Sequence, residues 1–317
     1  MRILIVYPAV IGLKNGNLVT AERWQRCLGE LGHNVEIAAT IDDRGDAPDL
    51  MIALHAIKSS GEIEKCRAAF VAVPIIVVLT GTDIYDVQSQ ATLDRVLALA
   101  DRIVVLQSAT ADDVAEPYRD KVRVIYQAVT PLDLSLERSN NYFDVCVVGH
   151  LRQVKDPFRA AEAITDLPGE SKIRVTQIGA AMTDKIMRRA FKLHDRNNER
   201  FRWIGEVQRE EALERIASSH LLVNSSQIEG GAAVICEAVV IGTPILATRI
   251  AGNVGFLGED YEGLFDVGQT DQLRDLLLAA EADDAFYQRL KSQCESRKYL
   301  FKPAFERRKW AELLEEF

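Results

Sequence analysis

The chain has 317 residues, of which 48% are apolar and 27% are charged. This length predicts two domains, each large enough for its own hydrophobic core, and the composition is typical of a globular protein. The formal net charge of −9 argues against nucleic acid as a main partner, and no apolar run approaches the roughly 20 residues that span a bilayer.

Short β-branched runs alternate with helical patterns along the whole chain. This order predicts parallel sheets that are covered by helices on both faces, as in doubly wound α/β domains. In the first half, strands are expected at residues 3–7, 35–39, 50–54, 75–79, 103–106 and 122–126, and helices at 21–31 and 92–100. In the second half, strands are expected at residues 143–148, 173–178, 202–204, 221–224, 244–248 and 264–267.

A polar, turn-rich segment at residues 131–141 separates the two sets of strands. We therefore predict Rossmann-like domains at residues 1–138 and 139–301. The last segment, residues 302–317, has an apolar helical face. In proteins of this architecture such a helix often returns to the first domain, and we expect that here; the competing interpretation is a helix that packs on the second domain.

Five scattered cysteines form no Cys-x-x-Cys pair. Their odd number and apolar neighbours predict reduced, mostly buried thiols, which are typical of a cytoplasmic protein. We expect no metal site. Residues 1–7 are too few for a signal peptide and are predicted to form the first strand.

The first helix and the loop before it carry Gly16, Asn17, Thr20 and Arg23. Thr20 is expected to cap the helix, and free amides together with the Arg23 guanidinium would bind an anion. The competing interpretation is a capped helix with a solvated Arg23. The glycines do not match G-x-G-x-x-G, so a nicotinamide cofactor is not expected.

Polar residues also follow two strands of the first half directly. His55 follows the third strand, and Thr80, Thr82 and Asp83 follow the fourth. Because ligands of doubly wound sheets bind at the carboxyl ends of the strands, these residues are candidates for a binding site. His55 would hold, orient or protonate a ligand. The competing interpretations are a structural histidine and an aspartate that only caps a turn.

In the second half, Gly149, Arg152 and Lys155 follow a strand and precede a helix. The two side chains place positive charge where a diphosphate would lie, and fixed cations stabilise the charge that develops on such a leaving group. These two side chains would take the place of a metal ion in binding the diphosphate. Since no D-x-D pair occurs in a plausible setting, we expect neither a metal nor a cofactor.

Glu229 and Glu237 stand eight positions apart in E-G-G-A-A-V-I-C-E. Gly230, Gly231 and Ala232 let the backbone approach a ligand and lead into a helix, so Glu229 lies in a loop and Glu237 about two turns along the helix. A sugar nucleotide needs this arrangement: one carboxylate for sugar hydroxyls, free amides for phosphate, and a second carboxylate for the ribose.

These second-half residues, in their order and spacing, resemble glycosyltransferase family 4 of the GT-B fold, in which two Rossmann-like domains face one another across a cleft. The resemblance implies that Gly205, Glu206 and Val207 hold the base of the nucleotide. It also places Ser226 near phosphate or sugar, although turn formation alone would explain a serine there.

A narrower resemblance, carried by residues 16–24, 53–56, 79–83, 147–158 and 225–232, is to the selenosugar synthases of selenoneine biosynthesis. It implies transfer of N-acetylhexosamine from UDP-GlcNAc to selenophosphate, with a new carbon–selenium bond and release of UDP and phosphate. The implied catalytic residues are Arg152, Lys155, Glu229 and His55. The implied donor-binding residues are Gly149, Arg152, Lys155, Gly205, Glu206, Val207, Ser226, Glu229, Gly230, Gly231, Ala232 and Glu237. The implied acceptor-binding residues are Gly16, Asn17, Thr20, Arg23, His55, Thr80, Thr82 and Asp83.

The expected partners are these two small molecules, with no nucleic acid and no membrane, and the chain is expected to be a monomer or a homodimer. Three other functions stay open at this point. They are a family 4 transferase that acts on a hydroxyl of a lipid or metabolite, a UDP-GlcNAc 2-epimerase, and a nucleotide-sugar sensor that catalyses nothing.

Overall fold

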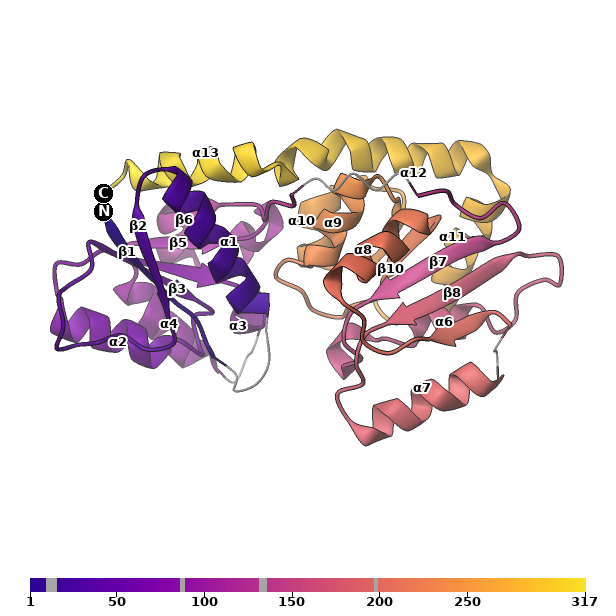
Figure 1. Ribbon diagram of the computed structural model, residues 1–317, viewed down its shortest axis with the longest axis horizontal. Helices are drawn as coiled ribbons and strands as arrows, with labels where there is room; N and C mark the ends of the chain where they lie inside the picture. The colour runs from indigo at the N-terminus through magenta and orange to yellow at the C-terminus, as the bar shows by residue number, and fades with distance from the viewer. Residues whose placement is uncertain (10–15, 86–88, 131–135, 197–198) are drawn as a thin grey trace. The chain divides into compact units, whose positions relative to one another are not determined.

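The computed structural model describes residues 1–9, 16–85, 89–130, 136–196 and 199–317, and it divides into two compact units (Figure 1). The first comprises Met1–Ala128 and Pro303–Phe317, and the second comprises Val129–Lys302. The division falls before the predicted residue 138 because the N–H of Val129 donates to the carbonyl of Phe301 and Arg138 donates to Tyr287, both in the second unit. The predicted linker lies partly outside the described residues.

The first unit contains a six-stranded parallel sheet in the order β2-β1-β3-β4-β5-β6. Its strands are β1 (Arg2–Val6), β2 (Asn34–Ala38), β3 (Leu50–Leu54), β4 (Ile75–Leu79), β5 (Arg102–Val105) and β6 (Val122–Val124). Its helices are α1 (Gly16–Glu30), α2 (Ser60–Ala69), α3 (Thr82–Tyr85), α4 (Gln90–Leu99), α5 (Ser108–Asp113), the 3-10 helix η2 (Glu116–Lys121) and α13 (Pro303–Leu314). The chain order changes direction between β1 and β3.

Both faces of this sheet are covered, as the apolar strands predict. Successive side chains of a strand point to opposite faces, so Ile3 and Ile5 pack with α1 and α13, whereas Leu4 and Val6 pack with α2 and α4. Helix α13 thus belongs to the first unit, which confirms the predicted return of the last helix. Its Trp310 packs edge-on against Trp24 of α1, with ring centroids 4.8 Å apart.

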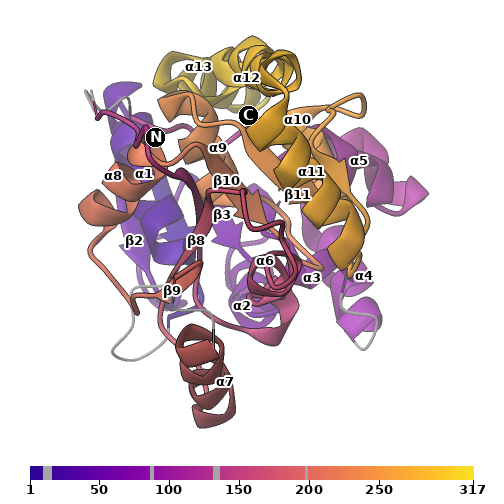
Figure 2. The same cartoon turned by 90° about the vertical axis from the view of Figure 1, so that its right-hand side faces the viewer.

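The second unit contains a six-stranded parallel sheet in the order β12-β11-β10-β7-β8-β9. Its strands are β7 (Phe143–Val148), β8 (Ile173–Ile178), β9 (Phe201–Trp203), β10 (Leu221–Asn224), β11 (Ile245–Thr248) and β12 (Leu264–Phe265). Its helices are η3 (Gln153–Lys155), α6 (Arg159–Ala163), α7 (Asp184–Arg196), α8 (Arg209–Ser218), α9 (Ala233–Ile241), α10 (Ala251–Leu257), α11 (Thr270–Ala282), α12 (Asp284–Arg297) and η4 (Lys298–Phe301). Helix α7 lies at one end of the unit, away from α9 and α12 in both views (Figures 1 and 2).

Counted from β7 as the first strand, the second sheet has the order 3-2-1-4-5-6 of dinucleotide-binding folds. Chain direction therefore switches between β7 and β10, and a ligand is expected outside the carboxyl ends of these two strands. This topology places the Gly149 loop beside the Glu229 loop, as the candidate residues require.

Strands β3, β4, β7, β8 and β10 have the predicted bounds, and the other strands differ from prediction by one or two residues at either end. Helix α1 begins at Gly16, before the predicted residue 21. Thr20 is therefore a buried residue inside the helix, and the prediction that it caps the helix is wrong. Four of the five cysteines are buried, as predicted. Within the described residues, no helix is long and apolar enough to cross a membrane.

Candidate active site

The carboxyl ends of β7 and β10 border a small cavity in the second unit, which we call the switch-point pocket. It is lined by Val147, Val148, Gly149, Lys155, Pro157, Gln177, Val223, Asn224, Ser225 and Ser226. Three predicted donor-binding residues, Gly149, Lys155 and Ser226, are thus brought together at the topological switch of the sheet, where nucleotides bind in folds of this kind.

Lys155 and Glu229 form an ion pair beside this pocket, and Ser226 fixes the carboxylate. The ammonium of Lys155 contacts Oε1 of Glu229, and the Ser226 hydroxyl donates to the same oxygen at 2.6 Å. The side chain of Glu229 is 10% exposed and that of Lys155 is 34% exposed. One cation, one hydroxyl and one carboxylate therefore converge at a site that solvent reaches from the lysine side.

The two loops that carry these residues are hydrogen-bonded to each other. The N–H of Gln227 donates to the carbonyl of Val154 at 2.8 Å, and the Ser225 hydroxyl donates to the carbonyl of Asp156 at 2.8 Å. Asp156 itself has a left-handed backbone, with φ of 42°. These bonds hold the Lys155 loop and the Glu229 loop in one rigid arrangement.

Glycines allow close backbone contacts on both sides of the pocket. A Cβ atom at Gly179 would lie 2.1 Å from the carbonyl oxygen of Gly149, and one at Gly252 would lie 2.1 Å from the carbonyl oxygen of Glu229. Any other residue at either position would displace a loop of the site. The first turn of α10, which contains Gly252, thus packs against the backbone of Glu229.

Glu237 lies on α9, the helix that follows the Glu229 loop. It contacts a residue that the sequence analysis did not propose. Its Oε1 accepts from the Arg209 guanidinium of α8 at 2.6 Å, and its side chain is 14% exposed. Helix α9 follows the Gly230–Gly231 turn, and its N-cap residue Ala232 provides no side-chain cap. The N-cap side chain therefore does not compete with an anion for the amides at the start of α9, of which the N–H of Ile235 donates to the carbonyl of Ala232 at 2.9 Å.

The remaining predicted donor-binding residues lie at the ends of neighbouring strands. Gly205, with φ of 76°, accepts at its carbonyl from the N–H of Gly179 at 2.7 Å. Glu206 after it is exposed and Val207 is half-buried. Arg152 is exposed, and within the described residues its side chain makes no hydrogen bond or ion pair. The loop after β9 is thus anchored by its backbone to the pocket's own sheet.

In the first unit, His55 lies after β3, beside the point where that sheet changes direction. His55 is buried and has φ of 68°, a left-handed conformation that is uncommon outside glycine and that often marks a functional site. Its Nδ1 lies 3.6 Å from Oδ2 of Asp83. The fully buried Asp83 carboxylate accepts from the N–H groups of Ala56, Thr80 and Gly81 at 2.7–3.1 Å.

Asp83 therefore joins the loops after β3 and β4, and it brings His55 and Thr80 together as predicted for neighbouring strand ends. Thr82 begins α3, and its side chain lies outside the described residues. Gly16 and Asn17 begin α1 at the end of the undescribed segment 10–15.

The side chain of Arg23, on α1, instead contacts α13. Its Nε is 3.2 Å from both carboxylate oxygens of Glu306, whose side chain is 2% exposed. Glu306 also accepts from Nε1 of Trp24 at 2.8 Å. The charge of Arg23 is compensated within the first unit, so an anionic ligand there would have to compete with Glu306.

Residues 134–297, more than half of the chain, match the family of group 1 glycosyl transferases. The chain belongs to this family. The matched segment contains the switch-point pocket, Lys155, Glu229 and Glu237. The glycosyl transferase activity predicted from the two glutamates is thereby established at the level of the family.

Solved structures share the fold of this glycosyl transferase over its full length. HepE of Anabaena in complex with UDP has a TM-score of 0.79 at 16% identity, with 100% of both chains covered. The UDP-forming α,α-trehalose-phosphate synthase of Burkholderia vietnamiensis has a TM-score of 0.79 at 14% identity, again with 100% of both chains covered. Sucrose-phosphate synthase of Thermosynechococcus elongatus has a TM-score of 0.78 at 15% identity, and the match covers 100% of this chain and 99% of the synthase. These likenesses confirm the predicted GT-B fold.

The sequence analysis did not identify two buried polar side chains of the glycosyl transferase, Gln177 and Asn253. Within the described residues, Oε1 of Gln177 and Oδ1 of Asn253 accept no hydrogen bond, although both side chains are at most 1% exposed. Gln177 lines the switch-point pocket. A glutamine in the predicted strand at residues 173–178 was the available signal, since a buried amide in a strand rarely lacks a hydrogen-bond partner.

His55 should make the stability of the enzyme depend on pH. Burial lowers the pKa of His55 from its ordinary value of 6.5, and Asp83 opposes part of this shift. Below about pH 6.5 the unfolded chain therefore takes up a proton that the folded chain resists, so the free energy of unfolding falls as the pH drops. We expect chemical denaturation between pH 7.5 and 5.5 to show a shallower fall for His55→Asn than for the wild type.

Asparagine is the suitable replacement because it tolerates the left-handed backbone of position 55. One group contributes at most about 1.4 kcal/mol per pH unit to the slope. Burial also lowers the pKa of His220, which both proteins retain and which serves as the common background. Equal slopes for the two proteins would show that His55 is not the group responsible.

Proposed function

We propose that this glycosyl transferase moves N-acetylhexosamine from UDP-GlcNAc to selenophosphate in the cytoplasm. The observation that carries the proposal is the convergence of Lys155, Ser226 and Glu229 at the switch-point pocket. The donor class is supported by HepE, which was solved with UDP and with UDP-glucose, and by the UDP-forming trehalose-phosphate synthase. The acceptor rests on the sequence motifs shared with selenosugar synthases of family 4.

In this proposal, binding of the donor replaces the ion pair between Lys155 and Glu229 with contacts from each side chain to the donor. The ammonium of Lys155, together with the exposed guanidinium of Arg152, binds the diphosphate, and the Glu229 carboxylate accepts hydrogen bonds from hydroxyls of the hexose. The uncapped amides at the start of α9 support the same diphosphate. Glu237 binds the ribose, sharing its carboxylate with Arg209.

The loop at Gly205, Glu206 and Val207 receives the base through its backbone. Gly149 and the Gly230–Gly231 turn let the main chain approach the phosphates. These residues supply binding and orientation. Arg152 and Lys155 supply the charge that stabilises the departing UDP, so we predict a reaction that requires no metal ion.

The chemistry then needs little help from a base. Selenium of selenophosphate attacks the anomeric carbon as the bond from that carbon to the UDP oxygen breaks, and UDP leaves with the electron pair. Water then cleaves the selenium–phosphorus bond, which yields phosphate and the selenosugar. Because selenium in selenophosphate is already nucleophilic, no proton has to be removed as it would from a hydroxyl. His55, neutral when its pKa is lowered by burial, therefore serves to position the acceptor.

The acceptor is small and anionic, so it needs amides and hydroxyls more than a long groove. Gly16 and Asn17 at the start of α1, with His55, Thr80, Thr82 and Asp83 at the strand ends, are the proposed acceptor residues of the first unit. Thr20 is buried inside α1 and Arg23 is paired with Glu306, so both support the site from α1 in this proposal.

Incubation with UDP-GlcNAc and selenophosphate tests the proposal. We expect mass spectrometry to show UDP and a selenium-bearing N-acetylhexosamine, formed equally well with and without EDTA. Sulfate replaces selenophosphate in the negative control. Release of UDP only when a hydroxyl acceptor is supplied would contradict the selenophosphate assignment and favour the other family 4 reaction. UDP binding without any turnover would favour a sensor.

A further inference from the structure

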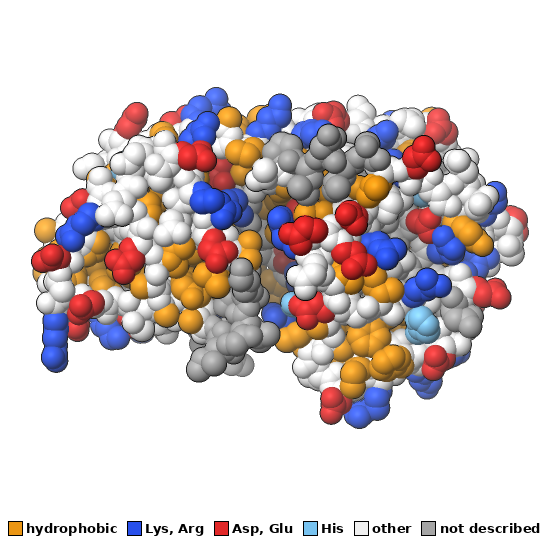
Figure 3. All heavy atoms as spheres, in the orientation of Figure 1, with side chains coloured by type: hydrophobic (Ala, Val, Ile, Leu, Met, Phe, Trp, Pro, Cys, Tyr) orange, Lys and Arg blue, Asp and Glu red, His pale blue; other side chains and the backbone are white. Residues whose placement is uncertain are grey.

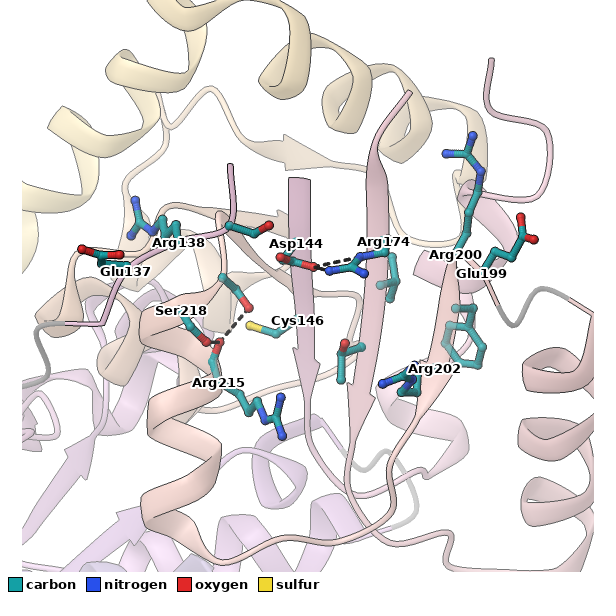
Figure 4. A pocket seen from close by; sticks show the side chains of 15 residues that line it. Glu137, Arg138, Asp144, Cys146, Arg174, Glu199, Arg200, Arg202, Arg215 and Ser218 are labelled. Atoms are coloured by element: carbon teal, nitrogen blue, oxygen red, sulfur yellow. Dashed lines mark hydrogen bonds and ion pairs between the residues drawn. The ribbon is translucent and has the colours of Figure 1, made fainter. Parts of the chain in front are cut away.

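The second unit contains a larger cavity, of about 460 Å³, whose walls are rich in arginine (Figure 4). We call it the arginine cavity. It is lined by Glu137, Arg138, Ser139, Asp144, Cys146, Arg174, Val175, Thr176, Glu199, Arg200, Phe201, Arg202, Arg215, Ser218 and Ser219. A cavity of this volume falls in the range of small-molecule sites.

The arginine cavity is separate from the switch-point pocket. Asp144, Arg174 and Arg202 are each the second residue of their strand, so the cavity lies toward the amino ends of β7, β8 and β9. Gln177, which lines the switch-point pocket, is three residues farther along β8 than Arg174 and on the opposite face. Three residues of a strand span roughly 10 Å. Among the residues that the structure describes, none lines both cavities.

Five arginines line this cavity although the chain carries a net charge of −9. On the face of the molecule in Figure 3, acidic and basic side chains are interspersed, in contrast to the excess of arginine in this cavity. The arginines come from the segment before β7, from β8, from the start of β9 and from α8. Converging arginines of this kind favour an anionic ligand.

The carboxylates near the cavity compensate only some of these charges. Asp144 pairs with Arg174 at 2.9 Å, and Glu211, outside the cavity, pairs with Arg215 at 3.3 Å. Glu137 and Glu199 are exposed at the rim, and no ion pair joins either of them to another described residue.

The other arginines bind neutral groups or nothing at all. Arg138 donates to the Tyr287 hydroxyl at 3.0 Å, and Arg200 donates to the carbonyl of Ser171 at 2.8 Å. Arg202 is exposed and contacts no hydrogen-bond or ion-pair partner in the described part of the chain. The positive charge of Arg138 also acts on a neighbouring group. Burial is the main cause of the lowered pKa of His220, and the charge of Arg138 is the second.

The arginines also differ in how firmly they are held. Arg174 is fixed between Asp144 and the Tyr142 ring, whose centroid is 3.3 Å from its guanidinium carbon. Arg202 on β9 and Arg215 on α8 border the cavity from two sides and extend toward the space between them (Figure 4). A fixed wall and two extended guanidinium groups match what a phosphate needs for bidentate contacts.

We propose that the arginine cavity is a second ligand site, which binds a small phosphorylated anion of up to nucleotide size through Arg202 and Arg215. Arg174 and Arg138 form the positive wall behind the phosphates, and the hydroxyls of Ser139 and Thr176 are the polar groups within reach of the rest of the ligand. This site is distinct from the donor site and takes its ligand while UDP is bound.

Calorimetric titration of the UDP-saturated protein tests the proposal with three probes: orthophosphate, inorganic diphosphate and ATP. We expect sub-millimolar binding of diphosphate or ATP, weakened about tenfold or more in the double variant Arg202→Ser/Arg215→Ser, since this variant removes both guanidinium groups that would make charge-assisted contacts to the phosphates. Orthophosphate, as the single-phosphate probe, is expected to bind more weakly than diphosphate.

The matched control is Arg188→Ser/Lys192→Ser on α7, which removes two exposed positive charges from the same unit and should leave the affinity unchanged. Unchanged thermal melting of both double variants shows that they are folded. Absence of binding at millimolar probe, displacement of the probe by UDP, or equal losses in the two double variants would each overturn the proposal. The comparison of variants locates the site whether or not the proposed UDP-sugar reaction is correct.

Discussion

Lys155→Ala should lower the turnover of UDP-GlcNAc by about two to three orders of magnitude while the protein stays folded. Lys155 is the cation that meets Glu229 at the switch-point pocket. Charge on the diphosphate grows as the glycosidic bond breaks, so a fixed cation stabilises the transition state more than the bound donor, and loss of one such group typically costs a factor of 10²–10³. The effect should therefore appear mainly in kcat and less in the KM for UDP-GlcNAc.

Steady-state kinetics with UDP release as the readout measures this effect. Lys155→Arg keeps the charge but changes its geometry, so it should retain more activity than Lys155→Ala. Lys192→Ala removes an exposed lysine of α7 and should behave like the wild type. If Lys155 only holds the loop of Glu229, Lys155→Ala would instead lower the melting temperature and leave kcat within about twofold, and the proposed role would be wrong.

The fold was predictable because its signals are local. Apolar runs such as residues 75–79 and 221–223 are typical of buried strands in a covered parallel sheet, and the strands at 75–79 and 221–224 have the predicted bounds. Gly149, Lys155 and Glu229 were found from their order and spacing in the chain, and the observed strand order then brings the loops that carry them together at the topological switch.

What the sequence did not reveal are contacts between residues on different helices. Arg23 was predicted to bind an anion, but it meets Glu306, which lies 283 residues later in the chain. Glu237 was assigned from its spacing to Glu229, yet its partner Arg209 lies on a separate helix and has no pattern of its own. Such pairs depend on how helices pack on the sheet, and a helix signature says which face is apolar but not which polar group it will meet.

The arginine cavity was missed for the same reason. Its arginines are spread over residues 138–215, and no motif in the sequence predicts that they form an anion site. Alternation in β8 does mark Arg174 and Thr176 as facing away from the buried side. Only the sheet order, which sets β7, β8 and β9 side by side, shows that these polar positions share one surface with Arg202.

Glu306→Ala should cost about 3–5 kcal/mol of folding free energy, because it leaves the Arg23 guanidinium without its carboxylate. Arg23 is 19% exposed and Glu306 is 2% exposed, so solvent replaces the lost partner only in part, and Trp24 loses the acceptor of its indole N–H as well. Urea denaturation of the variant and the wild type measures the difference. Glu30→Ala is the matched control: Glu30 joins the same two helices through Arg307, but it is 59% exposed and should contribute at most about 1 kcal/mol.

The double variant Arg23→Met/Glu306→Met separates the two roles of Arg23. If Arg23 acts by joining α1 to α13, removing both charges should restore much of the lost stability, because no buried charge is left unpaired, and the KM for selenophosphate should stay within about twofold. If Arg23 binds the acceptor, the double variant would be stable but its KM for selenophosphate would rise at least about tenfold. We expect the first result, since both oxygens of Glu306 already lie 3.2 Å from the Arg23 Nε.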